Sequence, residues 1–189
     1  AQAAANRVSE SWTTIPHFFT AITVDMSALI SKTKQKGIGY TYTDFIILAV
    51  AESVTSQPAV NGIWEHGTAT IMDSTHLGLV VQTKTGLVIP TLTDIQNHSI
   101  DEIALNRSKL VKQAHDGKLT ATAMTPATLT LSNIGQGHID HFTAIISPPQ
   151  LAILSAGSIQ NKPMVVANEI VIKPTATFIL GADHRAIDG

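Results

Sequence analysis

The feature that most constrains this chain is a long apolar run, residues 170–181, followed by the charged segment Asp183-His184-Arg185-Ala186-Ile187-Asp188-Gly189. The length of the run and its β-branched residues predict a buried strand. A strand that ends in a charged cluster delivers polar side chains to one fixed place. Because histidine can take and return a proton near neutral pH, His184 is a candidate general base. A solvated strand end is the alternative interpretation of the His184–Asp188 pair, since short motifs produce false positives.

The composition narrows the classes of function. Hydrophobic residues make up 44% of the 189 residues and charged residues 14%, which is apolar for a soluble monomer and predicts surface buried against other subunits. A net charge of -2 gives no electrostatic basis for binding nucleic acid or a membrane surface. The chain has no cysteine, which excludes thiolate nucleophiles, disulfides and cysteine-ligated metals. With no secretory signal and no long apolar span in the sequence, we expect a bacterial cytoplasmic protein, with the mitochondrial matrix as the alternative.

Helices and strands are predicted along the whole chain without strict alternation. Apolar periodicity and Gly or Pro breaks predict helices at 3–12, 27–36, 43–57 and 100–116, the last opened by a capping box of Ser99 and Glu102. Strands are predicted at 17–26, 77–82, 87–92, 127–132, 151–157, 164–166 and 170–180, with a hairpin at 62–72. We therefore expect one α/β domain with a mixed sheet rather than a doubly wound fold.

Ser132 is the best chemical partner for His184, because it ends a predicted strand and precedes the glycine-rich loop Asn133-Ile134-Gly135-Gln136-Gly137. As a nucleophile it lacks the Gly-x-Ser-x-Gly elbow. It can instead donate a hydrogen bond to a developing oxyanion. It can also simply cap a strand end, as serines in turns do. The residues alone leave these interpretations open.

The segment Gly137-His138-Ile139-Asp140-His141 contains metal-ligating residue types, but its spacing supports a hydrogen-bonded turn better than a metal site. We therefore expect no metal. His17, beside Pro16 and two phenylalanines, is expected to pack at a strand start rather than to catalyse. No glycine-rich loop precedes a predicted helix, so nucleotide hydrolysis and dinucleotide binding are unsupported.

Five motifs, in order along the chain, carry a resemblance to a known family. They are Thr14-Ile15-Pro16-His17-Phe18, Gly86-Leu87-Val88-Ile89-Pro90, Thr130-Leu131-Ser132-Asn133-Ile134-Gly135, His141-Phe142-Thr143-Ala144-Ile145-Ile146-Ser147-Pro148-Pro149-Gln150, and the final segment, which matches D-H-R-x-x-D-G. From about Arg7 to Gly189, the chain resembles the catalytic domain of the dihydrolipoyl acyltransferase component of 2-oxo acid dehydrogenase complexes, with the pyruvate dehydrogenase type as first choice.

The resemblance implies a reaction and a role for each site residue. The family moves an acyl group, expected here to be acetyl, between the thiol of a dihydrolipoyl arm and the thiol of coenzyme A. His184 would be the general base on the attacking thiol, and Ser132 would hydrogen-bond the oxyanion. Asp188 carries a catalytic label in the family, and we expect it to orient the loop rather than to transfer a proton. Arg185 is expected to be structural.

The resemblance also implies an architecture and partners. We expect a mixed-sheet α/β sandwich of the chloramphenicol acetyltransferase-like type, and homotrimers whose active site lies between subunits, so that His184 and Ser132 come from different chains. Larger hollow cores are also expected. The partners would be a lipoyl domain, which carries the lipoyl group outside this chain, and the decarboxylase and dehydrogenase components. We expect residues 1–189 to form a single catalytic domain with an N-terminal arm at about 1–15, without the C-terminal helix of the family.

There are two alternative functions, one in the same class of enzyme and one in a different class of function. The first is an acetyltransferase with a small free acceptor, against which the arginine after His184 argues. The second is a structural core subunit without catalysis, against which an intact His184 and Ser132 argue. The residues do not decide between acetyl, succinyl and branched-chain groups, because pocket shape controls that choice.

Overall fold

The computed structural model describes residues 2–34, 39–135 and 137–188, so Gly189, Gln136 and the end of the predicted helix 27–36 lie outside the described residues. The helices are α1 (Gln2–Thr14), α2 (Ser27–Thr33), α3 (Tyr42–Ser56) and α4 (Ile100–His115), with short 3₁₀ turns η1 (Pro58–Val60), η2 (Ile95–Asn97) and η3 (Thr122–Met124). The strands are β1 (His17–Asp25), β2 (Gly62–Glu65), β3 (Thr68–Ile71), β4 (Leu77–Leu79), β5 (Val81–Thr83), β6 (Gly86–Val88), β7 (Thr91–Leu92), β8 (Leu129–Asn133), β9 (Ala152–Ala156), β10 (Gln160–Val166) and β11 (Glu169–Asp183).

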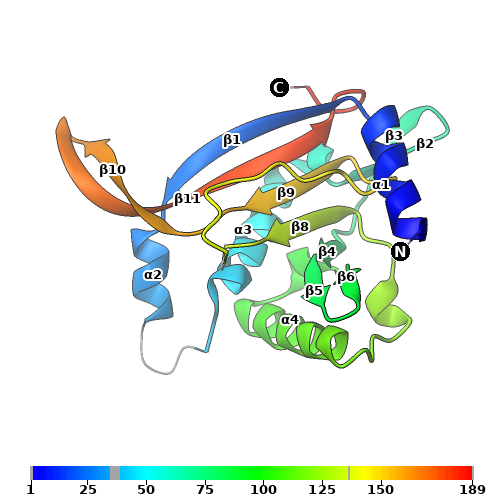
Figure 1. The fold of residues 1–189 in the computed structure, drawn as a ribbon, viewed down its shortest axis with the longest axis horizontal. Helices are drawn as coiled ribbons and strands as arrows, with labels where there is room; N and C mark the ends of the chain where they lie inside the picture. Colours follow the sequence, from blue (N-terminus) through cyan, green and yellow to red (C-terminus); the bar gives the residue numbers. More distant parts are fainter. Residues whose placement is uncertain (1, 35–38, 136, 189) are drawn as a thin grey trace.

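The central sheet is mixed, which confirms the predicted fold class. Its strands follow the order β1-β11-β9-β8-β4-β7, and β10 pairs with the first half of β11 (Figure 1). The strand β8 runs parallel to both β9 and β4, whereas β1 and β9 run antiparallel to β11. Consequently β8, which carries Ser132, and β11, which is followed by His184 and Asp188, point in opposite directions.

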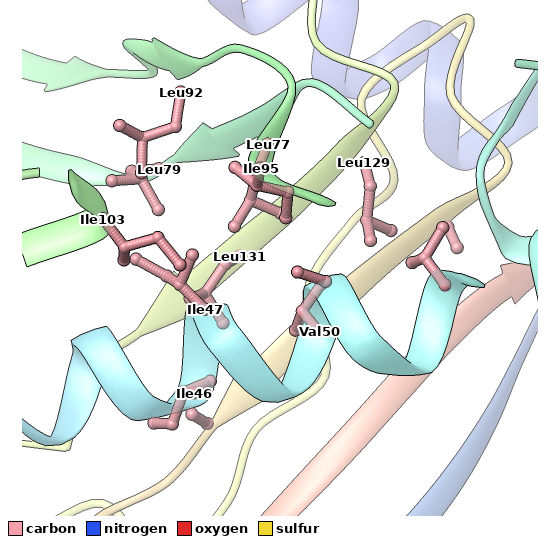
Figure 2. Close-up of a cluster of buried hydrophobic side chains, with 14 of the residues drawn as sticks. Ile46, Ile47, Val50, Leu77, Leu79, Leu92, Ile95, Ile103, Leu129 and Leu131 are labelled. Atoms are coloured by element: carbon pink, nitrogen blue, oxygen red, sulfur yellow. The ribbon is translucent and has the colours of Figure 1, made fainter. Parts of the chain in front are cut away.

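Buried apolar clusters lie on both faces of the central sheet, a large one on one face and a small one on the other. The helix α3 is apolar on nearly all sides, and Ile46, Ile47 and Val50 pack from it against leucines of the sheet (Figure 2). The labelled sheet leucines in this cluster are Leu77, Leu79, Leu92, Leu129 and Leu131. On the opposite face a smaller cluster of Ile15, Ile146 and Ile153 lies at the end of α1.

Helix boundaries follow from local capping. In α4 the carboxylate of Glu102 accepts the Ser99 backbone N–H at 2.8 Å, and Ser99 Oγ accepts the Glu102 N–H at 3.3 Å, so the predicted capping box is confirmed. The helix ends before Gly117, whose φ of 66° is the left-handed conformation common after a helix. The helix α3 begins one residue earlier than predicted, because Thr41 caps it and donates its backbone N–H to Asp44 at 2.7 Å.

The predicted strands 77–82 and 87–92 each divide in two. The strands β4 and β7 pair inside the central sheet, whereas β5 and β6 form a separate hairpin. The break follows from Pro90, which accepts the Leu79 N–H at 2.8 Å but has no N–H with which to continue the ladder. Val80 instead donates to the Leu131 carbonyl at 3.1 Å.

The first half of β11 is exposed, so the prediction of a fully buried strand is wrong for this part. Among the described residues, β10 is the only strand that pairs with residues 169–174, and β10 and this part of β11 project beyond the rest of the sheet (Figure 1). Val165 pairs with Ile170, and Pro163 pairs with Ile172, so all four lie on one face. Ile170 and Ile172 are 80% and 76% exposed. We call these four residues the apolar stripe.

Candidate active site

The strand β11 ends in a tight turn that carries His184. Asp183, at its start, is fully buried and donates its backbone N–H to the Leu151 carbonyl at 2.9 Å. The Asp183 carbonyl accepts the backbone N–H groups of the third and fourth residues after it, each at 3.0 Å. The turn is therefore anchored to the sheet at its first residue.

Arg185 neutralises the buried Asp183. Its Nε and Nη2 atoms donate to the two carboxylate oxygens at 2.9 and 2.6 Å, and its backbone N–H donates to Oδ1 at 3.0 Å. These hydrogen bonds raise the pKa of the Arg185 guanidinium above its ordinary value. Because the guanidinium of Arg185 is hydrogen-bonded to both carboxylate oxygens of Asp183, the geometry agrees with a structural role for Arg185.

The backbone of His184 is held by a hydrogen bond, whereas its side chain is partly open to solvent. Its N–H donates to the Pro16 carbonyl at 3.0 Å, and its ring lies 4.6 Å from the ring of Phe18, centroid to centroid. The side chain is 52% exposed, so a reacting group can reach it. Nδ1 lies 3.6 Å from Asp188 Oδ1, and Asp188 is 97% exposed. That distance exceeds a hydrogen bond, so in one chain the aspartate guides the ring weakly.

Ser132 lies near the end of β8, and hydrogen bonds of the next residue hold the loop that follows it. The Asn133 side chain donates to Thr43 Oγ1 at 3.1 Å and accepts the Gly135 N–H at 2.9 Å, which fixes the loop that follows the serine. The residue is buried, and within residues 2–34, 39–135 and 137–188 its hydroxyl has no hydrogen-bond partner. This hydroxyl is thus available to a ligand, whereas capping of its own strand end does not engage it.

The structure does not bring Ser132 and His184 together within one chain. Ser132 pairs with Ser155 of β9, and Ser155 pairs with Ile179 of β11. His184 comes five positions after Ile179 and lies two strand spacings from Ser132. With about 3.4 Å per residue and about 4.8 Å between strands, their Cα atoms are about 20 Å apart.

A cavity of about 600 Å³ opens beside the end of β8. Its lining is mostly apolar, with three titratable side chains among the residues that surround it, Tyr42, Arg107 and His115. The lining residues include Leu131, Asn133 and Gly135, which neighbour Ser132 in the sequence, and also Met26, Ile159 and Phe178. Ser132 is not among the lining residues: it lies between Leu131 and Asn133 in β8, and because side chains alternate along a strand, its hydroxyl points to the other face of the sheet.

An ion pair at the border of this cavity was not predicted from the sequence. Arg107 donates to the fully buried Asp44 from Nε at 2.5 Å and from Nη2 at 3.2 Å. The two residues lie on different helices, α3 and α4, far apart along the chain. Each sits within an otherwise ordinary helical pattern, so no local sequence signal links them.

His17 has structural surroundings. Nδ1 of His17 lies 2.9 Å from the Ile15 carbonyl and its Nε2 accepts the Ile146 N–H at 3.1 Å, as expected for a packed strand-start residue. Asp140 pairs with Lys162 at 3.4 Å. Across the described part of the chain, no three His, Asp or Glu side chains gather as a metal site.

Comparisons with known proteins place this geometry in a family. The family model described as 2-oxoacid dehydrogenases acyltransferase (catalytic domain) matches residues 1–189. The dihydrolipoyllysine-residue acetyltransferase component of the pyruvate dehydrogenase complex from Rickettsia felis is 31% identical over 98% of this chain and 47% of its own length. Its counterpart in Mycoplasma capricolum is 37% identical over 81% of this chain and 35% of its own length. The chain thus spans about half the length, or less, of these curated relatives.

Solved structures agree with this assignment. A probable dihydrolipoamide acetyltransferase from Listeria monocytogenes has a TM-score of 0.92 and 28% identity, over 100% of this chain and 84% of that one. The Azotobacter vinelandii dihydrolipoamide acetyltransferase has a TM-score of 0.92 and 25% identity, over 100% and 81%. A chloramphenicol acetyltransferase, at 13% identity and a TM-score of 0.60 over 97% and 87%, shares the fold alone.

No helix among the described residues has the length and apolarity needed to cross a membrane. A family model that covers the whole chain, relatives above 30% identity and solved structures of the same fold all agree. The chain belongs to the 2-oxoacid dehydrogenase acyltransferase family, as its catalytic domain.

Proposed function

We propose that this chain transfers an acetyl group between coenzyme A and dihydrolipoyl-lysine in the core of a bacterial pyruvate dehydrogenase complex. The bacterial relatives are named as that component. The main support for the proposal is that three residues here have the same spacing along the chain as three residues of a related enzyme. In the Azotobacter vinelandii enzyme, a serine, a histidine and an asparagine have been investigated for their role in the catalytic mechanism. The same intervals along the chain separate Ser132, His184 and Asp188 here.

His184 acts as the general base in this proposal. A thiol has an ordinary pKa of about 8.5, about two units above that of a histidine, so proton transfer concerted with attack is feasible. The attacking thiol gives its proton to the His184 ring as its sulfur forms a bond to the thioester carbon. Collapse of the tetrahedral intermediate breaks the bond to the other sulfur, which takes the proton back. The open side of His184 beside Phe18 supports this role.

Ser132 stabilises the oxyanion of that intermediate. The free hydroxyl at the end of β8 can donate to the negative oxygen, and loss of such a donor typically costs about 100- to 1,000-fold in kcat. Asp188 orients the His184 turn. An asparagine occupies the matching interval in the Azotobacter vinelandii enzyme, and an amide cannot exchange a proton near neutral pH, so orientation explains both residues better than proton transfer.

A second copy of the chain completes the site. Because Ser132 and His184 are about 20 Å apart in one chain, a catalytic pair requires Ser132 from one subunit and His184 from another. The exposed apolar stripe provides surface for such a contact. A related structure is the cubic core of a pyruvate dehydrogenase multienzyme complex. We propose a homotrimer as the unit, within a larger core that works with a lipoyl domain and the decarboxylase and dehydrogenase components in the bacterial cytoplasm.

The test is acetyl transfer from acetyl-CoA to free dihydrolipoamide by purified protein of known oligomeric mass. The wild-type chain should be active, and His184→Ala should lose several orders of magnitude in kcat while keeping its circular dichroism spectrum and mass. A His66→Ala variant, in an exposed hairpin turn, is the matched control and should keep wild-type turnover. Equal rates for His184→Ala and wild type would contradict the proposal.

A further inference from the structure

The guanidinium of Arg185 contacts a second group besides Asp183. Its Cζ atom lies over the ring of Trp64, 4.5 Å from the ring centroid. A cation in this position is attracted by the negative face of the ring, and the contact is strongest when it is partly shielded from water. Arg185 is 31% exposed at its side chain, and Trp64 packs against the main core. The guanidinium of Arg185 therefore contacts the Asp183 carboxylate and the face of the Trp64 indole at the same time.

Trp64 is itself fixed by the segment that anchors the turn. It lies in β2, and its backbone N–H donates to the Pro149 carbonyl at 2.7 Å. Two positions earlier in β2, Gly62 accepts the Leu151 N–H at 3.0 Å, and Leu151 in turn accepts the Asp183 N–H at 2.9 Å. One stretch of backbone thus sets the positions of the indole and of the buried carboxylate. Arg185 bridges the two.

His184 lies between Asp183 and Arg185 in the chain, so its direction depends on the bridge that Arg185 makes between Asp183 and Trp64. Outside it, the described contacts of His184 are one backbone hydrogen bond to Pro16, the Phe18 ring, and the loose approach of Asp188. We propose that Trp64 is a positioning residue for His184: by stacking on Arg185 it keeps the turn in the orientation that presents the histidine ring. This proposal rests on the proposed transferase function, and it adds a residue outside the five sequence motifs.

The kinetic test replaces the indole. Trp64→Leu should lower kcat by about tenfold, because small displacements of a catalytic group cost rate, while the KM for acetyl-CoA stays near the wild-type value. Trp64→Phe keeps an aromatic face and should recover most of the lost rate. Ile71→Ala removes an exposed apolar side chain from the same hairpin and should leave kcat unchanged. Wild-type kcat in Trp64→Leu, or no recovery in Trp64→Phe, would overturn the proposal.

A second measurement does not depend on activity. The chain has two tryptophans, so in a Trp12→Phe background all tryptophan fluorescence comes from Trp64. Replacement Arg185→Met should change that emission and increase acrylamide quenching, because the guanidinium no longer covers the ring. Unchanged quenching would show that the contact is absent and overturn the proposal even if Trp64→Leu is slow. Altered quenching in a chain without transferase activity would instead support the contact and refute the proposed function alone.

Discussion

Two variants that are inactive alone should become active when their chains share one assembly. In the proposed mechanism Ser132→Ala lacks the oxyanion donor and His184→Ala lacks the base, so each pure protein should fall below about 1% of the wild-type rate. If each site takes its serine from one chain and its histidine from the next, mixed assemblies contain intact sites. Random assembly of equal amounts places the two intact residues together at about one quarter of the interfaces.

The distance between the residues sets this expectation. A general base must come within about 3 Å of the group from which it takes a proton, directly or through one water. A separation of about 20 Å across a continuous hydrogen-bonded sheet cannot be closed by side-chain rotation. A site within one chain would therefore give no recovery in the mixture, because every chain lacks one of the two groups.

The assay is acetyl transfer to dihydrolipoamide after co-expression of the two variants in equal amounts. The matched control is wild type co-expressed with the double variant Ser132→Ala/His184→Ala. Shared sites predict about one quarter of the wild-type rate in both mixtures, whereas sites within one chain predict about one half in the control. No recovery in the variant mixture, together with one half in the control, would refute the shared site.

Three further predictions follow from individual contacts. Arg107→Met leaves the buried Asp44 carboxylate without its partner and should lower the free energy of unfolding by about 3 kcal/mol in urea titrations; a variant that also replaces Asp44 with Leu should recover part of the loss. Hydrogen bonds from Ser99 hold the pKa of Glu102 below its ordinary value. The ionised Glu102 side chain therefore stabilises the fold at pH values above its unfolded pKa, and this stabilisation is lost as the pH falls through its folded pKa. Glu102→Gln should flatten the acid side of the plot of stability against pH, measured by thermal melts. Gly157→Ala would place a methyl group against the carbonyl oxygen of a facing loop, so it should lower the melting temperature by several degrees, and a wild-type melt would contradict this packing.

The sequence predicted elements well where local signals were strong. The helix opened by Ser99 and Glu102 and the strand at 17–26 were found nearly to the residue, because capping residues and β-branched runs are local features. The break at Pro90 was missed, because its cause is the partner strand rather than the run itself. The exposure of Ile170 was missed for a related reason, since an apolar run does not reveal whether its cover comes from the same chain.

The sequence predicted which residues belong to the candidate site but not how far apart they lie. Motif resemblance singled out His184 and Ser132, but the distance between them depends on the strand order and direction that the structure supplies. The supports of the site were missed more completely. Trp64 and Arg185 are 121 positions apart, and their contact exists only because β2 lies beside the end of β11.

The direction of the strands is the physical basis for the proposal that assembly and catalysis are linked. The strand β8 is parallel to β9, and β9 is antiparallel to β11, so the loops after β8 and β11 leave the sheet at opposite ends. No change in loop length or side chain can join these ends within one chain. In the proposed mechanism, a second copy brings Ser132 and His184 side by side, and such a contact between copies needs apolar surface. The low charged fraction of the chain and the exposed stripe on the β10–β11 hairpin are what that requirement predicts.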